Sequence, residues 1–183
     1  MGGRSATAGA LAAIMLLVAG SAVAKEYPIG KPQYGGGLEV IAVYLKPVKM
    51  EAGGTMRPYT DSDIHLEADI HALGNNPNGL GEGEWAPFLS LTYTLRKIGG
   101  DGGTVTGAML PMIAADGPHY GNNVKLMGKG KYILTFQITP PAGVGSAKFA
   151  RHTDAETGVA GWFKPFKVDF TFNFDGFTDN SAD

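Results

Sequence analysis

The segment 63–72 carries a row of potential metal ligands. Its residues alternate between an apolar set and a polar set: the apolar set is Ile64, Leu66, Ala68, Ile70 and Ala72, and the polar set is Asp63, His65, Glu67, Asp69 and His71. Because successive side chains of a β-strand point to opposite faces, this pattern predicts a strand with an apolar core face and a polar face whose neighbours lie about 7 Å apart. Imidazole and carboxylate groups crowded together without a cation favour a metal site. The alternative is an ordinary surface whose acids are balanced by lysines of a neighbouring strand.

The two other histidines and one methionine could complete such a site. His119 lies in the motif Asp116-Gly-Pro-His-Tyr-Gly121, where glycine and proline predict a turn, and His152 lies in a loop before the last expected strand. Met112 follows a proline at the expected end of a strand, where its thioether can point toward a site. Three imidazoles and a thioether suit copper, and a carboxylate such as Glu67 extends the range to harder ions such as iron or manganese.

The composition excludes several other kinds of site. The chain has no cysteine, so disulfides, zinc–thiolate sites and cysteine nucleophiles are excluded, and methionine is the only soft sulfur ligand. The net charge is −2 and no basic run exceeds two residues, so nothing supports binding to nucleic acid. No pairing of a nucleophile with a base is evident, and we do not expect an enzyme.

Residues 1–24 have the pattern of a signal peptide. Arg4 provides a positive start, residues 10–22 are an apolar run, and Ala22-Val-Ala24 is a small-residue cleavage signal. The apolar run is shorter than the roughly 20 residues that a membrane-spanning helix needs. We therefore expect an exported, soluble mature chain, residues 25–183, with no segment inserted in a membrane.

The mature chain is predicted to be a single all-β domain. Its glycines and prolines fall between apolar stretches, which is typical of short strands joined by turns. Roughly seven strands are expected, at 38–45, 63–72, 85–98, 104–110, 123–127, 131–139 and 166–174. Strands at this spacing predict an antiparallel β-sandwich, and Tyr132 is placed like the tyrosine corner of an immunoglobulin-like domain.

Several motifs together resemble one known family. They extend through nearly all of the expected mature chain and are Asp63-Ile-His-Leu-Glu-Ala-Asp-Ile-His71, Gly81-Glu-Gly-Glu-Trp85, Pro111-Met-Ile-Ala-Ala-Asp-Gly-Pro-His-Tyr-Gly121, Gly130-Lys-Tyr132 and Arg151-His-Thr-Asp154. On these residues the chain resembles the periplasmic iron-transport proteins that partner with a high-affinity iron permease of the inner membrane in Gram-negative bacteria. The resemblance implies a periplasmic homodimer of immunoglobulin-like subunits that binds copper.

The resemblance also implies a set of metal ligands. They are His65, Glu67, Met112, His119 and His152. His71 and Asp69 share the polar face of the same strand. His71 lies about 20 Å along the strand from His65 by strand rise and is expected at a second site or on the surface, and Asp69 is a candidate for a second site or for a contact to a ligand. Asp116 is a candidate for an iron site, or for accepting the second ring N–H of a ligand histidine.

We therefore expect a carrier that supplies iron to an inner-membrane permease, with copper at the histidine–methionine site. Copper binds such a site more tightly than iron does, so copper binding alone would not identify the cargo. Transport requires release, which predicts an exposed, partly open site, and histidine ligands must be neutral, so affinity should fall as the pH decreases. The alternatives are a copper-handling or copper-resistance protein, a copper redox enzyme, and an adhesion or assembly domain with incidental histidines.

Overall fold

The computed structural model describes residues 25–51, 56–100, 102–141 and 149–177, and the fold is given for these ranges. The signal peptide expected at 1–24 lies outside them. The strands are β1 (Tyr27–Pro28), β2 (Gln33–Gly35), β3 (Leu38–Leu45), β4 (Ile64–Ala72), β5 (Ser90–Ile98), β6 (Gly103–Ala114), β7 (Gly117–Val124), β8 (Gly130–Thr139) and β9 (Phe166–Phe174), and a short 3-10 helix, η1, spans Tyr59–Asp61. No helix in the described ranges is long and apolar enough to cross a membrane.

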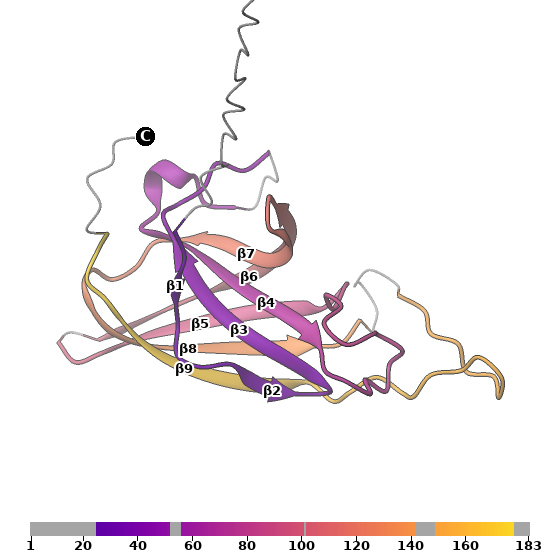
Figure 1. The fold of residues 1–183 in the computed structure, drawn as a ribbon. Coiled ribbons are helices and arrows are strands. Elements are labelled where there is room, and N and C mark those ends of the chain that lie inside the picture. The colour runs from indigo at the N-terminus through magenta and orange to yellow at the C-terminus, as the bar shows by residue number, and fades with distance from the viewer. Residues whose placement is uncertain (1–24, 52–55, 101, 142–148, 178–183) are drawn as a thin grey trace, which may run out of the picture.

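The strands form one antiparallel sheet that curls so that its two halves face each other (Figure 1). Its order is β1-β3-β4-β7-β6-β5-β8-β9, with β2 added to β3. β6 joins the halves, because its residues 103–109 pair with β5 and its residues 110–114 pair with β7. Pro111 lies in the second stretch, where β5 no longer pairs with β6, a position that accommodates a residue without an N–H. The prediction of a single, all-β, antiparallel domain is confirmed, although the two layers belong to one curled sheet.

The core lies between the two halves and is rich in aromatic rings. Tyr44 of β3 packs against Phe172 and Phe174 of β9, with ring centroids 5.5 and 5.9 Å apart. The alternation predicted for the last strand is confirmed, since every even-numbered side chain of β9 from 168 to 174 is buried. These large apolar groups fix the strands of one half against those of the other.

Tyr132 has the hydrogen bonds expected of a tyrosine corner. Its hydroxyl donates to the carbonyl oxygen of Gly128 at 2.6 Å and accepts from the N–H of Met127 at 3.1 Å. Its buried ring stacks on Phe172, with centroids 5.6 Å apart. The local feature is therefore as predicted. These hydrogen bonds connect the turn before β8 to the core. They do not by themselves show that the sheet is an immunoglobulin-like sandwich.

Three predicted strand boundaries are wrong, and two of them concern the β6–β7 hairpin. The strand expected at 85–98 begins only at Ser90, and Phe88, with a φ of 58°, is not extended. Of the strand expected at 123–127, only residues 123 and 124 lie in a strand, at the end of β7, which begins at Gly117, so His119 lies in a strand and not in a turn. β6 runs to Ala114 rather than to residue 110, so Met112 also lies within a strand. The turn is only two residues long, and Gly117, with a φ of 130° that favours glycine, follows it directly.

Candidate metal site

Met112 and His119 face each other across the β6–β7 hairpin. The register pairs Ala114 with Gly117 and, two residues further along each strand, Met112 with His119. Directly opposed residues of an antiparallel pair have Cβ atoms about 5 Å apart. A two-residue turn between the strands therefore places Met112 directly opposite His119.

β4 contributes the next two side chains. Its even-numbered residues are at most 4% exposed, as the alternation predicts, and this turns His65 and Glu67 to the opposite face. β4 lies beside β7, where His65 is opposite Asn123 and Glu67 is opposite Gly121. Residues 119, 121 and 123 share one face of β7 because side chains alternate along a strand. His119 therefore projects from the same surface as the two side chains of β4.

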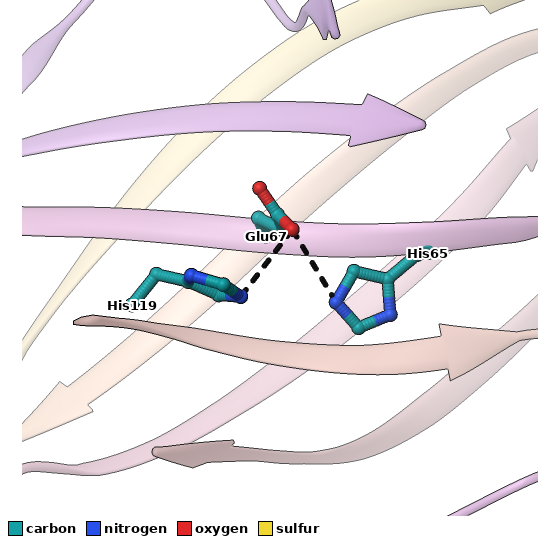
Figure 2. Close-up of side chains that lie close together, drawn as sticks. All are labelled: His65, Glu67 and His119. Carbon is teal, nitrogen blue, oxygen red and sulfur yellow. Dashed lines mark ion pairs between the residues drawn. The ribbon is translucent and has the colours of Figure 1, made fainter. Parts of the chain in front are cut away.

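The carboxylate of Glu67 lies between the two imidazoles (Figure 2). Its Oε1 is 3.4 Å from Nε2 of His65 and 3.3 Å from Nε2 of His119. The three side chains are buried, with exposed fractions of 0% for His65, 6% for Glu67 and 5% for His119. Bonds of about 2.1 Å to one ion place donor atoms roughly 3 to 4 Å apart. The donor atoms of this trio, which all lie within 4.8 Å of one another, are close to that spacing.

The hydrogen bonds of Asn123 decide which nitrogen of His65 carries a proton. Asn123 Oδ1 accepts from the N–H of Val48 at 3.2 Å, and Nδ2 donates to the carbonyl oxygen of Val48 at 2.9 Å, so the amide has one orientation. Nδ1 of His65 is 2.9 Å from the same Oδ1. Because an amide oxygen can only accept a hydrogen bond, Nδ1 must carry the hydrogen and donate it. Nε2 then has a lone pair, which faces Glu67. Within the described part of the chain this buried nitrogen has no hydrogen-bond partner.

Burial shifts the pKa values of His65 and Glu67 in opposite directions. Loss of hydration lowers the pKa of His65 to about 4. Burial raises the pKa of Glu67 to about 8, and the nearby charges of Asp69, Glu26 and Asp116 add to this shift. Near neutral pH the metal-free site therefore holds a neutral imidazole beside a protonated carboxyl group. A cation would provide the partner that Nε2 lacks and the charge that a buried carboxylate requires.

A cleft of about 400 Å³ leads to these side chains. Its walls include residues 112–116 of the hairpin, residues 48–50 after β3, and Glu26 near β1. Burial and the charges of Asp69 and Asp116 raise the pKa of Glu26, so carboxylates gather on this side of the site. The prediction of an exposed site is wrong for the donor side chains, which are buried. Access is provided instead by the cleft.

Gly121 leaves space beside two donor atoms. A Cβ at this position would lie 2.7 Å from Nε2 of His65 and 2.8 Å from Sδ of Met112. Both atoms are thus within 3 Å of one point, which places the thioether next to the unpaired nitrogen. Four of the five predicted ligands, namely His65, Glu67, Met112 and His119, therefore lie around one point.

His152 does not reach this point within its own chain. Its loop contacts the segment after β4, where the N–H of Ala160 donates to the carbonyl oxygen of Pro77 at 3.0 Å. Figure 1 shows the loop beyond the arrowhead of β4, whereas the site lies on the first half of that strand. Glu67 and Ala72, at the end of β4, are already roughly 17 Å apart by strand rise.

The other polar residues of segment 63–72 have different surroundings. His71 lies near the far end of the strand, in a bridge to the segment before β5, and is outside the trio. Burial raises the pKa of Asp69, while the charges of His119 and His71 oppose the shift. Asp63 forms an ion pair with Lys125 at 2.8 Å. The alternative of an ordinary surface, with acids balanced by lysines of a neighbouring strand, is therefore correct for Asp63. It does not hold for Glu67, which faces two imidazoles.

Three residues of the site are absent from the set predicted from the sequence. Asn123 and Gly121 follow His119 at intervals of two, so the alternation would have placed them on the same face had β7 been predicted as a strand. Glu26 has no comparable signal, because it approaches the site through the path of the N-terminal segment.

Comparison with known proteins shows the family. The model of the Fe2+ transport protein family matches residues 23–176. The chain belongs to this family. Among its relatives, a UPF0423 protein of Brucella abortus is 51% identical over 171 residues, which cover 93% of each chain. The 34 kDa membrane antigen of Treponema pallidum is 38% identical over 157 residues, or 82% of this chain and 74% of the antigen.

Two solved structures extend this relationship to the fold. A copper-bound variant of FetP from uropathogenic Escherichia coli strain F11 is 48% identical, with a TM-score of 0.79 over 84% of this chain and 99% of that chain. Copper-reconstituted P19 protein from Campylobacter jejuni is also 48% identical, with a TM-score of 0.79 over 85% of this chain and 99% of that chain. The family resemblance carried by the sequence motifs is confirmed.

The shifted pKa values predict how the stability of the metal-free protein depends on pH. Protonated Glu67 favours the folded state, and this contribution is lost as the pH rises from about 4.5 to about 8. Neutral His65 favours it too, and that contribution is lost as the pH falls from about 6.5 toward 4. The two effects oppose each other between pH 4.5 and 6.5. Stability should therefore fall between pH 6.5 and 8, by at most about 1.4 kcal/mol per pH unit.

Urea unfolding of chelator-treated protein across this range measures the slope. Glu67→Gln should remove the decline above pH 6.5, because a neutral amide needs no charge compensation. The same change at the exposed Glu82 is the matched control and should leave the slope as in the wild type. Equal slopes in wild type and Glu67→Gln would contradict the assignment of the raised pKa.

Proposed function

We propose that this chain is a periplasmic iron-transport protein that binds a copper- or iron-class ion through His65, Glu67, Met112 and His119, with His152 of a second copy as the fifth ligand. The unpaired Nε2 of His65 is the observation that carries this proposal. It is buried, its lone pair faces a carboxyl group, and the thioether lies beside it. A cation bound among these atoms satisfies all of them at once.

The donor set and the relatives favour copper in the site and iron as cargo. Two imidazoles and a thioether are ligands that copper prefers, and the carboxylate accommodates harder ions. The similar FetP and P19 structures are described as copper-bound or copper-reconstituted, which supports copper. The family is described as transporting Fe2+, which supports iron. Because copper outcompetes iron at such donors, a resident copper ion and an iron cargo are compatible.

A second copy of the chain explains the position of His152. This histidine is exposed, and its loop lies at the end of β4 away from the site of its own chain. In a twofold dimer, each loop would contribute to the neighbour's cleft and receive the same contribution in return. We propose a homodimer of this kind, in which the ligand set predicted from the sequence is complete.

The remaining parts of the proposal concern location and partner. The pattern of residues 1–24 supports export to the periplasm, and the described ranges contain no helix suited to a membrane. Such a carrier would pass its ion to an inner-membrane iron permease and act without catalysing a reaction of its own.

The tyrosine corner at Tyr132 and the two facing halves of the sheet support an immunoglobulin-like description of the fold.

Metal titration tests the site directly. The wild type should bind copper stoichiometrically, and each of Met112→Leu and His119→Ala should weaken binding without unfolding the domain.

Affinity measured against a competing chelator should rise by about tenfold per pH unit below pH 8, since one proton must leave Glu67. The absence of stoichiometric copper uptake, or equal affinity at acidic and neutral pH, would refute the proposal. Impaired growth of a deletion strain under iron limitation, but not under copper excess, separates iron transport from copper resistance.

Gly121→Ala places a methyl group between two of the proposed ligands. Its Cβ would lie under 3 Å from both Nε2 of His65 and Sδ of Met112, so one donor must move away. We expect copper affinity to fall by on the order of tenfold or more. Gly74→Ala is the matched control, because its Cβ would meet only the flexible end of Glu82, at 3.3 Å. Unchanged affinity in a folded Gly121→Ala protein would place the metal elsewhere.

Mixing two variants tests whether His152 acts across the dimer. His119→Ala and His152→Ala homodimers should each bind copper weakly. In a mixed dimer, the chain that retains His119 receives His152 from its neighbour, so one site in each mixed dimer regains wild-type affinity. If each site takes both histidines from one chain, no mixed dimer recovers. Titration of the separated heterodimer distinguishes these outcomes.

A further inference from the structure

Asn123 lies at the junction of three parts of the molecule. It is opposite His65 in the β4–β7 pairing and is 3% exposed. Two limbs of the chain between β3 and β4, residues 46–51 and 56–63, converge on its amide. Nδ2 donates to the carbonyl oxygen of Val48 in the first limb at 2.9 Å, and to that of Arg57 in the second at 3.2 Å.

The amide is fully used by these contacts. Oδ1 accepts from the N–H of Val48 and from Nδ1 of His65, and both hydrogens of Nδ2 are donated to backbone carbonyls. An asparagine side chain can form four such bonds, and this one forms all of them. Rotating the amide would break every bond, so the ring of His65 and the two limbs are held by one rigid group.

The limb that Val48 belongs to is a wall of the cleft. Val48, Lys49 and Met50 all line it. Lys49 also lies over the ring of Tyr59 in the second limb, with its Nζ 5.2 Å from the centroid. The side chain that orients a predicted ligand therefore also positions the wall that faces that ligand.

We propose that Asn123 is a positioning residue that couples the state of His65 to the closure of the cleft wall formed by residues 46–51. This inference rests on the proposed metal-binding function. Asn123 holds the proton of His65 on Nδ1, so that Nε2 presents its lone pair to the cleft. It also holds the wall through Val48.

The coupling follows from how hydrogen bonds polarise one another. A cation at Nε2 withdraws electrons from the imidazole and makes its Nδ1–H a stronger donor to Oδ1 of Asn123. A more polarised amide then donates more strongly through Nδ2 to the carbonyl of Val48. Ion binding thus tightens the wall, and by reciprocity an opened wall weakens the hold on the ion.

Two measurements on the wild type test this without any variant. In metal-free protein above neutral pH, the ring-nitrogen resonances of His65 should show the hydrogen on Nδ1. A hydrogen on Nε2 would overturn the proposal. Amide hydrogen exchange in residues 46–51 should slow when copper is added. Equal exchange with and without copper, in protein shown to bind it, would refute the coupling.

Variants separate the two roles of the amide. Asn123→Ala should weaken copper affinity by about 10- to 100-fold and abolish the effect of copper on exchange in residues 46–51. Asn123→Asp retains an acceptor for His65 but no donor for the carbonyl groups, so it should keep the Nδ1–H form while exchange in the wall becomes fast. Asn122→Ala is the matched control, because Asn122 is the neighbouring residue of β7 and donates instead to the carbonyl of Ala108. It should change affinity by less than about twofold.

The outcomes distinguish this inference from the proposed function. A wild type that binds no copper refutes the metal site, whereas the ring-nitrogen measurement still decides the orientation imposed by Asn123. A folded Asn123→Ala protein with wild-type copper affinity and wild-type exchange refutes the positioning role, even if copper binds as proposed.

Discussion

A buried lone pair that faces a carboxyl group is the constraint on which the rest of this structure depends. Nε2 of His65 and Oε1 of Glu67 are 3.4 Å apart, and among the described residues this buried nitrogen has no hydrogen-bond partner. An unsatisfied buried polar group costs on the order of 1–3 kcal/mol. Such an arrangement persists because the apolar face of β4 is packed into the core and does not allow the strand to turn over. The core therefore maintains a local cost that a bound cation would relieve.

The sheet fixes the donor atoms through register rather than through loops. β6, β7 and β4 are adjacent, so Met112, His119 and Glu67 stand at cross-strand distances that the backbone ladder determines. Donors on strands are held more closely than donors on loops. Tyr120 reinforces this, since its hydroxyl donates to the carbonyl of Ala86 and anchors β7 from the core side next to His119. Four of the proposed donors are thus preorganised, and in the proposed homodimer the fifth, His152, would come from the second copy of the chain.

One regularity, the period of two, carries much of what the sequence predicts about the fold and two residues of the site, while the full ligand set comes from the family resemblance. The period of two places His65 and Glu67 on one face of β4 and the aromatic side chains of β9 in the core. The same rule fails at β7, because Gly117 and Pro118 indicate a turn just before His119. The actual turn is one step earlier, at residues 115 and 116, and Gly117 already begins the strand. The positions of Glu26 and Asn123 depend on which strands become neighbours. Pairing across long sequence separations is a property of the whole sheet and leaves no local pattern.

Burial would both strengthen and limit metal binding at the proposed site. Removing water from His65 keeps its imidazole neutral and ready to bind at any pH above about 4. Removing water from Glu67 makes its carboxyl group retain a proton up to about pH 8, so an incoming ion must displace that proton. Near neutral pH this competition costs about one pKa unit, or roughly 1.4 kcal/mol of affinity. A carrier has to release what it binds, and a carboxyl group that readily regains its proton favours release. The depth of the site therefore suits transport better than permanent retention.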